Sequence, residues 1–236
     1  MEQLAALTRE HNVLLVVDGI TAVGVYDIPM DRWGIDVMVT GSQKALMLPP
    51  GLAFIALSKQ GWARVEKTRQ RRFYFDLLRE RDSQSRMTTA YTPAISLITG
   101  LHESLAMIEE EGLQVRFDRH ERLARATRAA ARGLGLRLLA PENPSPAATG
   151  MHVPEGVDGS GLVGYLRDKM QVTFGGGQDR LKGRVVRIGH LGYIGMLETI
   201  AAVGALEMAL RHFGYPVTLG KGVAAAQEVL MDSLPQ

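Results

Sequence analysis

An aspartate and a lysine occupy matching places in the first fifty residues of the chain. Residues 13–17 form a continuous apolar run that predicts a strand buried on both faces of a parallel sheet, and Asp18 follows it directly. The next predicted strand, residues 37–40, is followed within four residues by Lys44. Because neighbouring parallel strands end at the same edge of a sheet, we expect Asp18 and Lys44 to lie close together.

These two residue types suit the chemistry of pyridoxal phosphate. That cofactor needs a lysine amine to form an imine and a carboxylate to keep its pyridine nitrogen protonated. Asp18 would supply the carboxylate, and Lys44, once displaced by substrate, would carry a proton between carbon atoms. Taken singly, however, a strand-end aspartate is more often a turn or helix-cap residue, and a lone loop lysine usually faces solvent.

The context of the pair is more specific than the pair itself. Residues 16–24, 36–44 and 49–52 place the aspartate, the lysine and a proline-glycine turn in an order and spacing that resemble the class V aminotransferases of the alanine–glyoxylate and serine–glyoxylate type. The resemblance implies that Lys44 is the Schiff-base lysine. It also implies that Asp18 and Gln43 contact the cofactor.

The resemblance continues through residues 91–97. In the family, this segment reaches across a dimer to the partner's cofactor phosphate, which makes Thr89 and Thr92 candidates for phosphate binding. A threonine cap on a helix that Pro93 starts is a compatible alternative.

Residues 187–192 resemble the family motif in which an arginine binds the substrate α-carboxylate. A planar guanidinium can donate two parallel hydrogen bonds to a carboxylate, so Arg187 would fix the orientation of the substrate. Without the motif, Arg187 would be interpreted as an edge or salt-bridge residue. Residues 175–178 include three glycines but lack the lysine and hydroxyl residue of a phosphate loop, so we interpret them as a flexible turn.

The implied fold is α/β. We expect residues 1–93 to form part of the large domain of a fold-type I pyridoxal-phosphate transferase, with a mixed, mostly parallel sheet. Residues 94–236 should form a connecting long helix and a C-terminal α+β small domain. Apolar periodicity predicts helices over residues 1–11, 92–111, 115–134, 158–170, 196–213 and 223–231, and strands over 13–17, 37–40, 52–57, 136–140, 151–153, 172–174 and 185–189.

Some parts of the family pattern are missing from the sequence. Family members carry a portion before the strand that ends at Asp18, which supplies a phosphate-binding turn, a ring stacked on the pyridine and several strands. We therefore expect an N-terminally truncated form in which the strands ending at Asp18 and near Thr40 have unpaired edges or faces.

Composition narrows the possible partners. A net charge of +2 gives no strong field for nucleic acid or membranes, so the basic and aromatic segment 69–75 is not interpreted as a nucleic-acid site. The absence of cysteine excludes thiolate chemistry within this sequence and favours a reducing cytoplasm. The six histidines lack metal-ligand spacing, and no apolar stretch is long enough to span a membrane. The arginines of residues 116–132 are interpreted as a solvated helix face.

The sequence thus predicts a homodimeric aminotransferase that moves an amino group from alanine or serine to glyoxylate or pyruvate. Two alternatives stay open. One is a pyridoxal-phosphate lyase of the same fold, although a desulfurase would need a cysteine. The other is a non-catalytic remnant that only dimerises.

Overall fold

The computed structural model describes residues 1–232, and the chain divides into two compact units. Unit 1 comprises Met1–Val23 and Asp27–Glu110, and unit 2 comprises Gly24–Tyr26 and Glu111–Gln236. Each unit is described by itself below.

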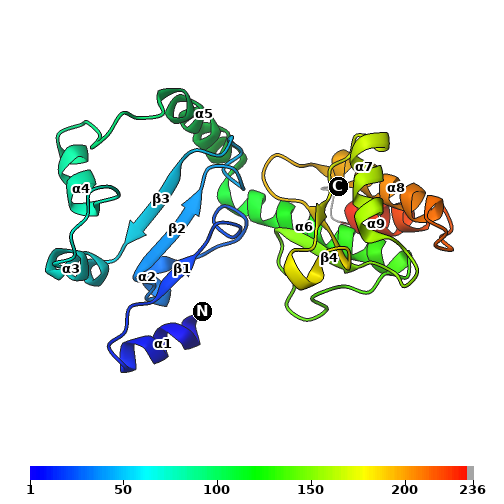
Figure 1. Cartoon of the computed structure of the whole chain (residues 1–236), viewed down its shortest axis with the longest axis horizontal. Coiled ribbons are helices and arrows are strands. Elements are labelled where there is room, and N and C mark those ends of the chain that lie inside the picture. The colour runs from blue at the N-terminus through cyan, green and yellow to red at the C-terminus, as the bar shows by residue number, and fades with distance from the viewer. Residues whose placement is uncertain (233–236) are drawn as a thin grey trace. The chain divides into compact units, whose positions relative to one another are not determined.

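A three-stranded sheet lies at the centre of unit 1 (Figure 1). Its strands are β1 (Val16–Asp18), β2 (Val37–Gly41) and β3 (Ala53–Leu57), in the order β1-β2-β3. The β1 and β2 strands are parallel, whereas β2 and β3 are antiparallel, so the predicted mixed sheet is confirmed. The bounds of β2 and β3 differ by one residue from the predicted ranges 37–40 and 52–57.

The first strand differs from its prediction. It is shorter than the apolar run, and it is not buried on both faces, since Val13 is 55% exposed and Val16 is 61% exposed. The reason is its position: within the described part of the chain β1 pairs only with β2, so its other edge has no strand beside it. The expectation of an unpaired edge is met at the strand ending in Asp18, but not at the strand near Thr40, because β2 pairs with β1 on one side and with β3 on the other.

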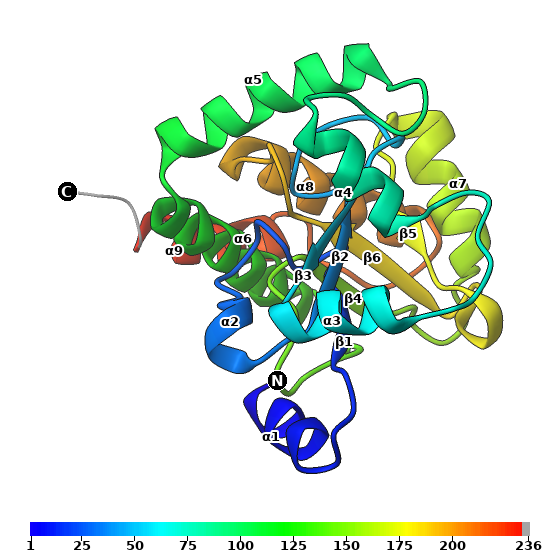
Figure 2. The same ribbon diagram turned by 90° about the vertical axis from the view of Figure 1, so that its left-hand side faces the viewer.

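Five helices of unit 1 accompany the sheet, and Figure 2 views it from the side on which α3 and α4 lie. They are α1 (Glu2–Glu10), α2 (Met30–Trp33), α3 (Lys59–Lys67), α4 (Leu77–Ser85) and α5 (Ile95–Glu111). The helices α3 and α4 were not predicted, because residues 60–91 show no regular apolar period. Their N-cap residues could have revealed them: Ser58 accepts a hydrogen bond from the backbone of Gly61, and Asp76 accepts one from Leu78.

Unit 2 is an α+β structure, as predicted. Its antiparallel sheet has the order β4-β6-β5. The elements are α6 (Leu113–Gly133), β4 (Ala148–His152), α7 (Gly159–Met170), β5 (Gly175–Gly176), a short 3-10 helix (Asp179–Leu181), β6 (Val185–Gly189), α8 (Met196–His212) and α9 (Lys221–Met231).

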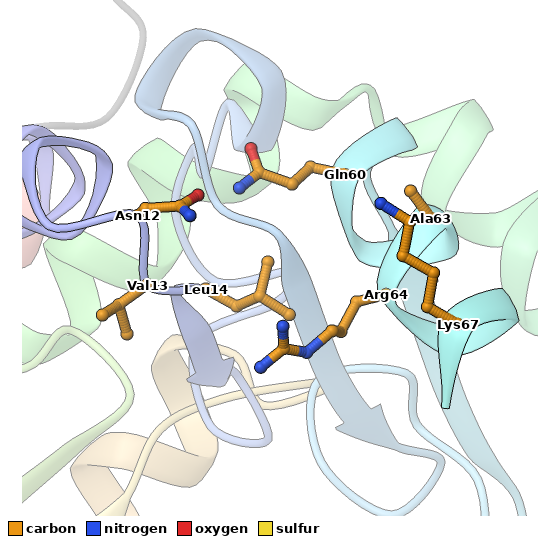
Figure 3. Close-up of a pocket in the computed structure, with 7 residues that line it drawn as sticks. All are labelled: Asn12, Val13, Leu14, Gln60, Ala63, Arg64 and Lys67. Atoms are coloured by element: carbon orange, nitrogen blue, oxygen red, sulfur yellow. The ribbon is translucent and has the colours of Figure 1, made fainter. Parts of the chain in front are cut away.

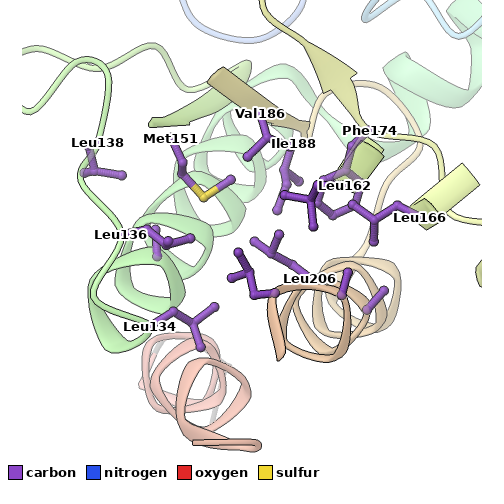
Figure 4. Close-up of a cluster of buried hydrophobic side chains, with 14 residues drawn as sticks. Leu134, Leu136, Leu138, Met151, Leu162, Leu166, Phe174, Val186, Ile188 and Leu206 are labelled. Atoms are coloured by element: carbon purple, nitrogen blue, oxygen red, sulfur yellow. The ribbon is translucent and has the colours of Figure 1, made fainter. Parts of the chain in front are cut away.

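One face of this sheet packs against helices. Met151, Val186 and Ile188 point into a cluster of buried apolar side chains with Leu162 and Leu206 from α7 and α8 (Figure 4). From Val186 to Gly189 buried and exposed residues alternate along β6, so Arg187 lies on the opposite, exposed face. The core therefore fixes which way the β6 side chains point.

Two strand predictions in unit 2 were wrong. Residues 136–140 make only an isolated bridge between Leu138 and Met151. The strand expected at 172–174 lies instead at Gly175–Gly176, because the side chain of Phe174 is buried in the helical core while the glycine pair reaches β6. The glycine segment is thus partly a paired strand and not simply a flexible turn.

The arginines of α6 do not form one solvated face, which corrects the prediction from charge pattern. Arg116 is only 1% exposed and Arg128 only 7%. Arg116 donates to the backbone oxygen of Gly24 and to Glu111, and Arg128 pairs with Glu121. Burial is tolerated because each guanidinium has an acidic partner.

Candidate functional site

The backbone positions of Asp18 and Lys44 agree with the prediction that each residue follows the carboxyl end of its strand. Asp18 is the last residue of β1 and stands opposite Val39 of the parallel strand β2. The β2 strand ends at Gly41, so Lys44 follows it by three residues (44 − 41). Both residues therefore lie at the carboxyl side of neighbouring parallel strands.

A buried serine shapes the loop that carries Lys44. The Ser42 hydroxyl donates to the carbonyl oxygen of Pro49 over 2.7 Å and accepts from the backbone N–H of Leu52 over 3.2 Å. The Ser42 carbonyl accepts from the N–H of Leu48. Ser42 thus joins the start of the loop to its end. Sequence reasoning quoted this residue beside Lys44 but gave it no role.

Helix α5 supports the same loop from within unit 1. The Ser104 hydroxyl donates to the Leu46 carbonyl oxygen over 2.5 Å. Gly51 has a φ of +150°, which residues with a side chain rarely adopt, and a Cβ atom added there would lie 2.5 Å from Leu97 Cδ1. A larger residue would therefore strain this turn and displace Leu97. Helix α5 thus belongs with unit 1, which ends at Glu110.

Asp36, which belongs to the same segment 36–44 as Lys44, stabilises the opposite end of the sheet. Its carboxylate oxygens accept from the backbone N–H of Leu15 over 2.9 Å and from the hydroxyl of Ser58 over 2.8 Å. Asp36 is 8% exposed. It thereby ties the segments before β1 and after β3 to the start of β2.

The other cofactor candidates are solvent-exposed. Gln43 lies over Gly41, whose added Cβ would come within 2.8 Å of Gln43 Oε1. The Thr89 hydroxyl donates to the Tyr91 carbonyl oxygen over 2.6 Å, and Thr92 is exposed. Helix α5 starts at Ile95, and neither threonine side chain caps it in the described structure, so the helix-cap alternative is not observed.

Arg187 is flanked by glycine residues on both neighbouring strands. In the central strand β6 it pairs with Gly150 of β4 on one side and Gly175 of β5 on the other. Its Nε donates to the Gly176 carbonyl oxygen over 3.0 Å. A Cβ atom at Gly175 would lie 3.3 Å from that Nε, so the missing side chain leaves room for the guanidinium. Arg187 belongs to unit 2, whereas the other candidates belong to unit 1.

The loop after β6 is fastened to α6 by polar contacts that sequence reasoning missed. The Gly192 N–H donates to His120 Nε2 over 3.0 Å, so the proton of this ring lies on Nδ1, which contacts the Arg116 carbonyl oxygen. Arg119 donates to the carbonyl oxygens of Gly192 and Ile194. Burial, with the nearby Arg119 and Arg116 charges, lowers the pKa of His120 to about 4, so the ring stays neutral.

The groups that pyridoxal phosphate would need are available. Asp18 Oδ1 accepts from the backbone N–H of Ile20 over 2.9 Å, while Oδ2 has no hydrogen-bond partner among residues 1–232. The Lys44 amine likewise makes no ion pair within those residues. An amine and a carboxylate that no internal ion pair neutralises fit the donor set of this cofactor.

A pocket of about 420 Å³ lies elsewhere in unit 1, between the segment before β1 and α3 (Figure 3). Asn12, Val13, Arg64 and Lys67 are among its lining residues, and none of the predicted site residues is. Across the part of the chain that the structure describes, no helix is long and apolar enough to cross a membrane. No cluster of His, Cys, Asp or Glu suited to a metal was found in that part either.

Comparisons with known proteins place this geometry in a family. The sequence model of aminotransferase class-V matches residues 1–180. The small subunit of a soluble hydrogenase from a Synechococcus species is 42% identical over 98% of this chain and 60% of its own length. L-Aspartate–glyoxylate aminotransferase of Paracoccus denitrificans is 41% identical over 93% of this chain and 56% of its own length.

A solved aminotransferase structure has the same fold over most of this chain. Pyridoxamine–pyruvate aminotransferase of Mesorhizobium loti superposes with a TM-score of 0.92 at 30% identity, over 98% of this chain and 60% of its own length. The chain thus spans about three-fifths of the length of the relatives that it matches. Its fold is that of a fold-type I aminotransferase in part. The chain belongs to the class V aminotransferase family.

Proposed function

We propose that this protein is a pyridoxal-phosphate-dependent aminotransferase. It would move an amino group from a small amino acid such as alanine or serine to a 2-oxo acid such as glyoxylate or pyruvate. The observation that carries the proposal is the placement of Asp18 and Lys44 at the carboxyl side of adjacent parallel strands, in a chain of the class V family. Relatives named for glyoxylate and pyruvate support the choice of acceptor.

Each candidate residue has a distinct part in this proposal. A bound cofactor would supply an electron-withdrawing ring that eases removal of the substrate's α-proton. Lys44 holds the cofactor and moves that proton, and the Asp18 carboxylate stabilises the positive charge on the ring nitrogen. Gln43 contacts the same cofactor, whereas Thr89 and Thr92 bind the phosphate of the cofactor held by the other chain of a dimer.

Arg187 binds the substrate carboxylate in the same proposal. Its guanidinium offers planar, paired donors, and the adjacent Gly175 leaves them uncovered. A fixed carboxylate would set the angle between the breaking C–H bond and the cofactor ring.

We also propose a cytoplasmic homodimer. Phe73 and Phe75, before α4, and Met87, after it and close in sequence to Thr89, are 80–95% exposed. Large exposed apolar side chains are typical of contact surfaces. The absence of cysteine suits a reducing compartment.

The name hydrogenase, carried by two of the relatives, is not transferred to this chain. Iron–sulfur clusters and many other redox metal centres are held by cysteine thiolates, and the 236 residues include no cysteine. The Asp18 and Lys44 pair has an evident use in amino-group transfer instead.

Borohydride trapping tests the proposal at a single atom. The full chain is incubated with pyridoxal phosphate, reduced with borohydride, digested and mapped by mass spectrometry. We expect the label on Lys44, its loss in Lys44→Arg and its retention in Lys59→Arg, which changes an exposed lysine of α3. Labelling of Lys59 or Lys182 in place of Lys44 would contradict the assignment.

A further inference from the structure

Tyr91 joins two segments of unit 1 that lie on either side of α4 in the sequence. Its hydroxyl donates to the carbonyl oxygen of Phe73 over 2.6 Å, and its ring packs edge-on against Tyr74 with the ring centroids 4.6 Å apart. Both partners precede α4, whereas Tyr91 lies in the segment that links α4 to α5 (Figure 1). The side chain of Tyr91 therefore ties the end of this excursion of the chain to its beginning.

The two threonines that are proposed to bind phosphate lie on either side of Tyr91. The Thr89 hydroxyl donates to the Tyr91 carbonyl oxygen over 2.6 Å, which holds the Thr89 side chain against the backbone of Tyr91. Thr92 follows Tyr91 directly and precedes Pro93, whose ring favours an extended backbone at Thr92. A hydroxyl proton can rotate from one acceptor to another, so Thr89 can still donate to an anion. Tyr91 thus anchors the backbone from which both hydroxyls project.

Arg79 of α4 holds a positive charge against Tyr91. Its Nη1 donates to the Tyr91 hydroxyl over 3.3 Å, and its guanidinium carbon lies 4.9 Å from the centroid of the Tyr91 ring. The hydroxyl gives its own proton to Phe73, so its lone pairs remain available to accept from Arg79. The face of an aromatic ring attracts a cation. These contacts place the guanidinium beside Tyr91 before any anion binds.

This charge is not neutralised within the described chain. Arg79 takes part in none of the ion pairs found among residues 1–232. Two of the carboxylates near it in sequence are matched to other arginines, Asp76 to Arg72 at 3.5 Å and Asp82 to Arg86 at 2.7 Å. Because Arg79 is exposed, its attraction for an anion acts through water and is screened by salt beyond about 10 Å. A phosphate monoester, with close to two negative charges at neutral pH, responds most strongly to such a charge.

We propose that Tyr91 is a positioning residue for the cofactor phosphate, and that Arg79, held on Tyr91, adds a positive charge that attracts this phosphate. Tyr91 acts through Thr89 and Thr92 by fixing their backbone. The inference rests on the proposed function for the part of the two threonines. It adds two residues to which no role in cofactor binding was given by the sequence.

Labelling of Lys44 by pyridoxal phosphate and by pyridoxal tests the part of Tyr91, because these compounds differ only by the phosphate. The concentration that half-saturates Lys44 labelling of the full chain is measured for each compound, and pyridoxal phosphate should need at least about tenfold less. Tyr91→Phe should reduce this ratio by about three- to tenfold, because the segment loses its bond to Phe73. Labelling by pyridoxal should stay the same. Tyr74→Phe, which removes a hydroxyl from the neighbouring ring, should leave the ratio unchanged.

Arg79 is tested by charge and by salt. Arg79→Gln should reduce the same ratio several-fold, and Arg79→Lys should restore part of it. Arg71→Gln, which removes an exposed positive charge before α4, is the matched control and should have no effect. An increase in sodium chloride from about 0.05 M to about 0.5 M should lower the ratio in the unaltered chain more than in Arg79→Gln, because salt screens an exposed charge.

Several outcomes would overturn the inference. Equal labelling of Lys44 by the two compounds in the unaltered chain, or an unchanged ratio in either Tyr91→Phe or Arg79→Gln, would do so while Lys44 labelling leaves the proposed function standing. A loss in Tyr91→Phe that is as large for pyridoxal as for pyridoxal phosphate would also overturn it, since the damage would then concern the fold and not the phosphate. Absence of label on Lys44 with both compounds would contradict the proposed function itself, and this inference with it.

Discussion

Units 1 and 2 organise their candidate residues in different ways. Within the described chain, both clusters of buried apolar side chains lie in unit 2. Unit 1 buries fewer side chains and exposes Val13, Val16 and Ile55 on or next to its sheet. Its Lys44 loop is shaped by hydrogen bonds from Ser42 and Ser104. Arg187, in contrast, is positioned by strand pairing above a closed core.

The two candidate regions therefore depend on different kinds of interaction. A side chain such as Arg187 keeps its place as long as the core under β6 is intact. The Lys44 loop depends on a few specific polar contacts and on a sheet with an unpaired edge. We therefore expect unit 2 to withstand perturbation better than unit 1 and to respond most strongly to changes in its core.

The largest expected effect is that of Leu162→Ala. Leu162 of α7 is fully buried, and removal of such a side chain costs about 2–5 kcal/mol through lost burial and a new cavity. Hydrogen exchange of α7 and α8 amides should rise accordingly. Val16→Ala, at a 61% exposed site in β1, is the matched change in unit 1 and should alter stability by about 0.5 kcal/mol or less.

Tryptophan fluorescence makes this comparison decisive. Trp33 and Trp62 are the two tryptophans of the chain, and both lie in unit 1. In denaturant, Leu162→Ala should therefore change amide exchange in unit 2 while the fluorescence transition moves little. A fluorescence transition that shifts as much as unit 2 exchange would show that the two units unfold together.

Mild acid should destabilise unit 2 through its buried histidines. Burial lowers the pKa values of His120 and His190 to about 4, against an unfolded value of about 6.5. Between these pH values the unfolded chain binds protons that the folded chain does not. Stability is therefore complete above about pH 6.5 and falls as the pH drops toward 4, because protons then favour the unfolded chain.

The pH dependence of α6 and α8 amide exchange measures this loss. His120→Gln should flatten the dependence, even though it lowers stability at neutral pH by removing the bond from Gly192. His102→Gln, at an exposed histidine of α5, should leave it unchanged. Exchange that is independent of pH between 6.5 and 4 in the unaltered chain would show that these rings are not kept neutral by burial.

Periodicity and motif spacing predicted much of this architecture. The strand that carries Arg187 was predicted at its observed bounds, because a short apolar run is a local property of the sequence. The buried arginines of α6 were not predictable from charge pattern, since their partners, such as Gly24 for Arg116, are distant in sequence. Ser42 was overlooked for a related reason: the pattern reveals a serine but not the carbonyl oxygen of Pro49 that it binds.

The smallest expected effect is confined to the Lys44 loop. Ser42→Ala leaves the Pro49 carbonyl oxygen and the Leu52 N–H without their buried partner, at a cost of about 1–3 kcal/mol. We expect faster exchange of the Leu48 and Leu52 amides and slower labelling of Lys44 by pyridoxal phosphate and borohydride, because the loop no longer holds the amine in place. Ser85→Ala, which removes an exposed hydroxyl at the end of α4, should change neither measurement. Since Arg187 and the core of unit 2 do not depend on this loop, α7 and α8 exchange should match that of the unaltered chain. Equal losses in both units would mean that Ser42 supports the fold as a whole, and the distinction between a locally ordered unit 1 and a core-ordered unit 2 would have to be abandoned.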